Sequence, residues 1–206
     1  MLALSEVRDK VLPNVSIRSH TFLLTLFCVT RELLKEQPSL TLVHVTGETT
    51  EFGIVENETL IESISLPFGL NTIIRECIGT SERTAQEIHS LLTLYHEGKL
   101  AKDDAKRMED VLTSYTTSIQ SALHEHAVRR RFPREAFILA PSSFTELFKS
   151  LLHPVLTHEI GLEHELLTLP RDNFGTTPTH DSDDDHLSVL SHFFHKLNTC
   201  GEIDPS

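Results

Sequence analysis

The sequence has no tryptophan and only three cysteines among its 206 residues, and the cysteine usage excludes a class of protein. Cys28, Cys77 and Cys200 are odd in number and far apart, so they form neither a disulfide framework nor a Cys-x-x-Cys pair. Scattered thiols of this kind are typical of a reducing compartment. We therefore predict a cytoplasmic protein.

Basic residues are scarce relative to acidic ones. Lysine and arginine number 18 against 30 aspartates and glutamates, which gives a formal net charge of −12. A nucleic-acid-binding domain usually presents a basic face. The charge balance therefore argues against a nucleic-acid partner.

Long apolar runs are lacking as well. His20–Val29 is apolar but short, and a bilayer span needs about 20 apolar residues. Met1–Lys10 is mixed polar and acidic, without the basic start and apolar core of a signal peptide. With 39% hydrophobic residues and a mean hydropathy of −0.13, the composition predicts a soluble globular core.

The segment Leu40–Val55 predicts a strand, a tight turn and a second strand. Leu40–Thr46 is rich in β-forming residues, and Gly47-Glu48 lies where the chain must reverse. A third strand, Thr59–Leu66, follows the polar break at Glu56–Glu58. These segments predict a three-strand antiparallel meander in which at least one strand is buried on both faces.

Helical periodicity marks most of the remaining chain. The predicted helices are Thr21–Glu36, Thr72–Gly79, Arg83–His96, Lys102–Arg131 and Phe144–Leu152. Ala136–Ala140 is predicted to be a strand, and Leu166–Leu169 a short edge strand. The longest helix is expected to turn six residues toward the core: Met108, Val111, Leu112, Tyr115, Ile119 and Leu123.

The C-terminal region is acidic and polar. Arg171–Asp185 is predicted to be disordered, because it has few residues that could enter a core. Leu187–Leu197 predicts a short amphipathic helix, with Val189, Leu190, Phe193 and Phe194 on one side. We expect this helix to dock back on the domain or to form a loose tail, rather than to be a dedicated partner motif.

The first turn of the meander has a composition that suits phosphate. Thr46, Thr49 and Thr50 surround Gly47, and backbone N–H groups and hydroxyls presented together can cradle a phosphate group. The alternative is an ordinary hairpin turn, since glycine is common in turns of every kind.

The order of these segments resembles the second lobe of the bacterial actin-like ATPases, the family of the cell-division protein FtsA and the pilus assembly protein PilM. Val43–Glu51 is similar to the family's strand ending in D-I-G-G-G-T-T-D, and Leu66–Asn71 to its I-P-V-G-G-N phrase. Gly79–Ser81 matches the G-T-S before an acidic helix. The likeness covers Leu40–Gly98 and, more loosely, Phe132–Leu152.

The resemblance implies an α/β fold, a single actin-like (ribonuclease H-like) lobe. Its sheet would be the antiparallel meander extended by Ala136–Ala140, with helices packed on it. The predicted organisation is a lead-in at residues 1–18, an actin-like second-lobe domain at 19–170, and an acidic, disordered tail with the amphipathic helix at 171–206.

The resemblance also implies which residues would contact ATP and magnesium, if either binds. They are Thr46, Gly47, Thr49, Thr50, Glu51, Gly69 and Ser142. Glu51 falls at the family's final acidic position, after Thr49 and Thr50, so these three would touch phosphate or magnesium. The alternative is that they are ordinary strand and turn residues.

Several positions depart from the family pattern. His44 replaces the aspartate at the strand end, and Thr46 and Glu48 replace two of three glycines, which leaves Gly47 alone. Threonine and glutamate permit close approach of a phosphate poorly, and Glu48 would add a negative charge beside it. We interpret the turn as a decayed nucleotide loop.

The adenosine side shows a second loss. Where the family has L-T-G-G-G-S, this chain has Leu139–Ser143 without a glycine, and Pro141 removes a backbone donor. The family binds nucleotide between two lobes, and this sequence resembles only the second. If the 206 residues are the whole product, we expect neither a closed cleft nor hydrolysis.

Thirteen histidines raise the question of a metal site. Their spacing does not support one, because there is no H-E-x-x-H and no Cys-His set with zinc spacing. Most are expected to face solvent, with His153, His158 and His164 in loop. His124 and His126 diverge on a helix, whereas His192 and His195 are spaced to share a metal. No G-x-S-x-G nucleophile motif occurs either.

Two functional hypotheses follow from the resemblance. The first is a non-catalytic scaffold that acts by protein–protein contact in type IV pilus assembly or cell division. It would reach the inner membrane only through a partner, and both a monomer and an oligomer fit this hypothesis. The second is a residual ATP-binding subunit that completes its cleft with a separate first-lobe polypeptide. A third, an adaptor without nucleotide ancestry, requires that the meander be absent.

Overall fold

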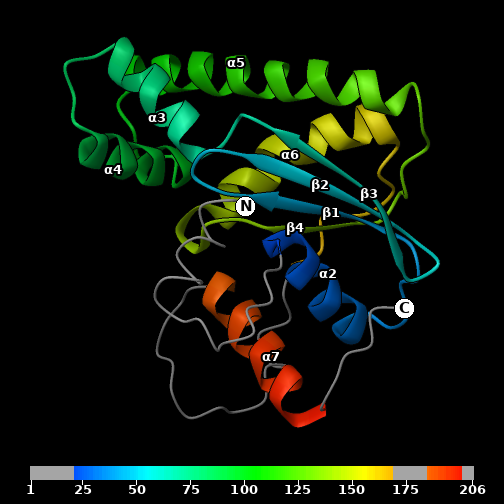
Figure 1. The fold of residues 1–206 in the computed structure, drawn as a ribbon. Coiled ribbons are helices and arrows are strands. Elements are labelled where there is room, and N and C mark those ends of the chain that lie inside the picture. The colour runs from blue at the N-terminus through cyan, green and yellow to red at the C-terminus, as the bar shows by residue number, and fades with distance from the viewer. Residues whose placement is uncertain (1–20, 169–184, 201–206) are drawn as a thin grey trace, which may run out of the picture.

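The computed structural model describes residues 21–168 and 185–200, and its centre is a four-stranded mixed sheet (Figure 1). The strands are β1 (Leu40–Val45), β2 (Thr50–Glu56), β3 (Thr59–Leu66) and β4 (Ala136–Leu139), in the order β3-β2-β1-β4. β1, β2 and β3 pair antiparallel, and β4 pairs in parallel with β1. The predicted meander and its extension by a fourth strand are confirmed.

A single parallel bridge continues the sheet beyond β4. Phe137 pairs with Leu167, whose carbonyl accepts from the Ile138 N–H at 2.8 Å and whose own N–H donates to the Ala136 carbonyl at 2.9 Å. This bridge lies within the predicted edge strand at Leu166–Leu169, of which Leu169 is outside the described residues. The described part of that segment therefore pairs over one residue only.

One face of the sheet carries the larger core. It is covered by α3 (Leu70–Gly79), α4 (Ala85–His96), α5 (Lys102–Ala127) and α6 (Thr145–Ile160). Strand residues alternate in direction, so every second side chain of β1 and β2 enters this core. These residues are Val43, Val45, Phe52 and Ile54.

The opposite face is covered by α2 (Phe22–Leu33) and α7 (Asp185–Cys200), which lie beneath the sheet in Figure 1. The intervening residues of β1 and β4 fill this second core: Leu40, Leu42, Phe137 and Leu139. All six residues of β1 are buried, which confirms that a strand is enclosed on both faces.

α5 uses the six predicted core residues to pack along the sheet and α6. The helix ends at Ala127, four residues earlier than predicted. The carboxylate of Glu159 on α6 binds α5 through Nδ1 of His124 at 2.8 Å and Nε2 of Gln120 at 2.9 Å. Among the helices in the described part of the chain, none is long and apolar enough to span a membrane.

The prediction that α6 ends at Leu152 is wrong, because the helix continues through Pro154 to Ile160. Proline has no N–H for the Ser150 carbonyl, and this loss is tolerated because Pro154 lies on the exposed side of the helix. The residues beyond it bury three apolar side chains, Val155, Leu156 and Ile160. His153 and His158 therefore lie on a helix and not in a loop.

α7 confirms the predicted C-terminal helix, and of the two expected arrangements, docking on the domain or a loose tail, it adopts the docked one. Val189 and Phe193 are buried against α2. The prediction that Phe194 shares this side is wrong, because successive helical residues are rotated by about 100°. Phe194 is 56% exposed, whereas Phe193 is 4% exposed. The predicted disordered segment lies outside the described residues, except for Asp185, which begins α7.

These two phenylalanines give a matched test of α7 docking. Phe193→Ala should lower the free energy of unfolding by about 3 kcal/mol or more, because it opens a cavity between α7, α2 and the sheet. Phe194→Ala should change it by less than about 1 kcal/mol. Urea denaturation followed by circular dichroism measures both, and equal effects would contradict the docked arrangement.

Candidate functional site

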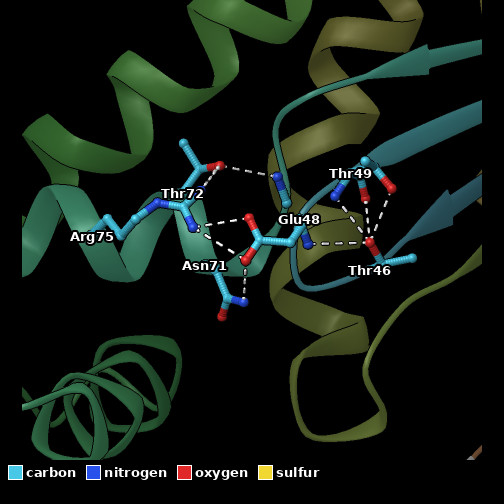
Figure 2. Close-up of polar contacts among 7 residues, drawn as sticks. Thr46, Glu48, Thr49, Asn71, Thr72 and Arg75 are labelled. Carbon is cyan, nitrogen blue, oxygen red and sulfur yellow. Dashed lines mark hydrogen bonds and ion pairs between the residues drawn. The ribbon is translucent and has the colours of Figure 1, made fainter.

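The turn between β1 and β2 is closed by hydrogen bonds within itself (Figure 2). The Thr46 hydroxyl oxygen accepts from the backbone N–H of Glu48 at 3.2 Å and of Thr49 at 2.9 Å. The Thr46 N–H donates to the Thr49 carbonyl at 2.8 Å. A phosphate-binding loop needs such N–H groups directed at the ligand. Here three of them are already bonded inside the turn.

The N-terminus of α3 is capped by the same turn. The N–H of Leu70 donates to the Thr46 carbonyl at 3.0 Å, and the N–H of Asn71 donates to the Gly47 carbonyl at 2.7 Å. The first N–H groups of a helix have no partner within the helix and commonly bind anions. In this chain, two of those donors are used to hold the hairpin turn.

Gly69 makes this contact sterically feasible. A Cβ atom at this position would lie 2.6 Å from the carbonyl oxygens of both Thr46 and Gly47. That separation is far below a normal contact, and the atoms that would have to move are backbone. Gly69 therefore allows the loop before α3 to approach the turn closely.

Glu48 places its carboxylate against α3. It accepts from Nδ2 of Asn71 at 2.9 Å and from Nη1 of Arg75 at 2.9 and 3.2 Å (Figure 2). The hydrogen bonds from Asn71 and Arg75 hold the pKa of the Glu48 carboxyl below its ordinary value. A carboxylate of the protein thus occupies the amide and guanidinium groups that could have bound an external anion.

Thr50 and Glu51 point to opposite faces of the sheet. Thr50 is fully buried in the larger core, where its hydroxyl donates to the Phe68 carbonyl at 2.6 Å and lies 3.2 Å from the Tyr115 hydroxyl. Glu51 lies on the face of α2 and α7, with Oε2 3.0 Å from Nδ1 of His44. The two residues therefore do not line one common site.

Ser142 lies at the end of β4, at the start of the short helix η1 (Ser142–Phe144). Its hydroxyl oxygen accepts from the backbone N–H of Asp185 at 3.0 Å. This bond fixes the N-terminus of α7 at the carboxyl end of β4. The Ser142 hydroxyl thus binds a helix of the same chain.

The predicted site residues separate into three places. Thr46, Gly47, Thr49 and Gly69 meet at the turn, Thr50 enters the core, and Glu51 and Ser142 lie toward α7. The sequence prediction did not include Asn71, Arg75 and Tyr115 as site residues. Asn71 lies inside the quoted Leu66–Asn71 motif, and Arg75 follows it by one helical turn, which was an available signal.

The exposed histidines are held by carboxylates at several points. Glu159 binds Nδ1 of His158 as well as Nδ1 of His124, each at 2.8 Å. Burial raises the pKa of Glu159, but its hydrogen bonds outweigh burial, and the net shift is downward. Across residues 21–168 and 185–200, no three histidine, cysteine or acidic side chains are placed to hold one metal ion.

Solved structures share this architecture. A chain of the PilM–PilN type IV pilus biogenesis complex matches with a TM-score of 0.61 and 12% identity, over 95% of this chain and 56% of that one. The Lmo2764 protein of Listeria monocytogenes, a candidate N-acetylmannosamine kinase, matches with a TM-score of 0.51 and 17% identity, over 84% of this chain and 64% of that one. No protein-family model and no curated protein matches the sequence.

These likenesses define the class of fold. The mixed sheet with its packed helices is that of a single lobe of the actin-like ATPases, as predicted. The chain spans less than two thirds of the length of these two solved chains. At these identities, the comparison establishes the architecture and not the activity.

Gly69→Ala should destabilise the protein by about 1–3 kcal/mol, because the added methyl group would collide with two backbone carbonyls. Gly79→Ala is the matched control, since a Cβ there meets no atom within 4 Å. It should leave stability unchanged or raise it by up to about 1 kcal/mol. Thermal and urea unfolding compare the two variants, and an unperturbed Gly69→Ala protein would disprove the close packing.

The buried phenol of Tyr115 should make the protein less stable at high pH. Burial raises the pKa of Tyr115 to about 12, with the Thr50 hydroxyl acting in the opposite direction. A tyrosine in the unfolded chain titrates near pH 10. The contribution of Tyr115 to the free energy of unfolding is therefore complete below about pH 10 and is lost as the pH rises toward 12. The loss should be on the order of 1–2 kcal/mol and should be absent in Tyr115→Phe.

The tyrosinate absorbance gives a direct check. Tyr95 is the other of the two tyrosines, so Tyr95→Phe leaves Tyr115 as the sole phenol. Its absorbance at high pH should develop near pH 12, and titration of the folded variant near pH 10 would contradict the buried environment.

Proposed function

We propose that this chain is a non-catalytic actin-like module that acts through protein–protein contact. The observation that carries the proposal is the closed turn. Its N–H groups bind the Thr46 side chain and the Thr49 carbonyl, and its own carbonyls cap α3. An ATP phosphate would have to displace these bonds.

Charge supports the same conclusion. The Glu48 carboxylate lies between the turn and α3, where it binds Asn71 and Arg75. Its negative charge would repel a nucleotide phosphate unless a metal ion lay between them. Glu51 is paired with His44 on the face of the sheet that α2 and α7 cover. We infer that ATP and magnesium are not required for its role.

The proposed setting is type IV pilus assembly, with cell division as the second possibility within the same family resemblance. The likeness to a chain of the PilM–PilN complex supports a protein partner within a pilus-assembly complex. We propose that the chain is cytoplasmic and reaches the inner membrane only through such a partner. Deletion of the gene should abolish pili and leave cell length normal, whereas filamentous cells with intact pili would favour division.

A residual ATP-binding subunit is the alternative. One feature favours it: Thr49, Thr50 and Gly69 retain the order of the family motif. A separate first-lobe polypeptide would then complete the cleft.

Titration calorimetry with ATP and magnesium distinguishes the two. We expect no saturable binding below about 1 mM, because the donors of the turn are already bonded. Glu48→Ala should gain weak, salt-sensitive pyrophosphate binding, because it leaves Asn71 and Arg75 without their internal anion. Glu97→Ala removes another exposed ion pair, with Lys99, and should gain none.

The contrary result is equally specific. Micromolar ATP binding by the unmodified protein, with binding or turnover lost in Glu51→Ala, would refute the non-catalytic assignment and support the alternative.

A further inference from the structure

A buried histidine lies where the N-termini of two helices meet the carboxyl ends of two strands. His44 is the penultimate residue of β1, and its ring stacks on Phe22 of α2 with ring centroids 4.6 Å apart. His186, the second residue of α7, places its ring centroid 5.3 Å from that of His44. The two imidazoles come from segments 142 positions apart, so only the tertiary fold brings them together.

Glu51 determines which nitrogen of His44 carries a proton. Its Oε2 lies 3.0 Å from Nδ1 of His44, and the two residues are directly opposite one another on β1 and β2. Because an ionised carboxylate can only accept, the Nδ1 atom is the donor in this bond. In the neutral ring, the Nε2 atom then presents a lone pair.

That lone pair is buried without a partner. His44 is 3% exposed, and its Nε2 atom has no hydrogen-bond partner among the described residues. β1 lies between β2 and β4, and Nδ1 of His44 faces Glu51 on β2. On the β4 side Ser142 holds the backbone of Asp185 at 3.0 Å, and His186 is the next residue.

The arrangement has the chemistry of a metal-binding histidine. A metal-binding histidine commonly donates its other ring N–H to a carboxylate, which orients the ring and makes the free nitrogen more basic. Imidazole nitrogen suits zinc and its neighbours in the transition series, whereas magnesium prefers oxygen. Glu51 and Asp185 add negative charge near the positive ends of α2 and α7.

We propose that His44 and His186 bind a divalent transition-metal ion of the zinc type, with water completing the coordination. The ion would fasten the N-terminus of α7 to β1 across the face of the sheet opposite to the larger core. The site does not depend on the proposed function, because the Glu51–His44 pair takes no part in the hydrogen bonds that close the turn.

Zinc titration of the full chain tests the site. We expect the unmodified protein to bind a single zinc ion with micromolar affinity, in competition with a chromophoric chelator. His186→Ala should weaken binding by at least about tenfold, and Glu51→Gln, which acts through His44, by about 10–100-fold. His186→Ala is preferred to a replacement of His44. His186 lies nearer the surface than His44, so removing its side chain disturbs the core less.

His158→Ala is the matched control. His158 is also an imidazole whose Nδ1 is bound to a carboxylate, that of Glu159, but it is exposed and lies on α6. Its replacement should change zinc affinity by less than about twofold, since it is not a ligand. A loss of binding in His158→Ala with none in His186→Ala would assign zinc to the α5–α6 histidines and overturn the proposal.

Hydrogen exchange provides the structural readout. Zinc should slow amide exchange across α7 in the unmodified protein and in His158→Ala, but not in His186→Ala. The absence of micromolar zinc binding, or equal affinity in the unmodified protein and His186→Ala, would each overturn the proposal.

Discussion

The contact between the first turn of α3 and the β1–β2 hairpin sets the character of this lobe. Two helical N–H groups donate to the carbonyls of Thr46 and Gly47, and Gly69 lets the backbones approach closely enough for these bonds to form. Because α3 is held there, Asn71 and Arg75 are within reach of Glu48. Donors at the N-terminus of α3 that could have bound a phosphate instead hold the helix to the hairpin.

The buried strand β1 divides the molecule into two chemically distinct faces. Thr50 and Tyr115 make their polar contact inside the larger core, whereas His44 and Glu51 pair on the face of α2 and α7. Adjacent residues of β2 thus serve different layers, as the alternation of a strand requires. Helix α7 is held on the second face by the buried side chains of Val189 and Phe193, by the Ser142 bond at its N-terminus, and by the contact of His192 with Glu32 of α2.

The fold was predicted most closely where local pattern and tertiary burial agree. The meander and the core-facing side of α5 follow from periodicity alone, because each apolar side chain has one face on which it can be buried. Prediction failed at α6, where burial of Val155, Leu156 and Ile160 outweighs the hydrogen bond lost at Pro154. It also failed at Phe194, since a short helix with apolar residues on two sides does not reveal which side docks.

For this protein, the sequence by itself determined the strand order of the hairpins and the positions at which it lacks the glycines of the pattern it resembles. Those properties depend on local backbone preference and on the period of apolar residues. Only the tertiary structure decided that Glu48 meets Arg75 and that His44 meets His186. Such contacts join segments distant in the chain, and their geometry depends on how the helices pack on the sheet.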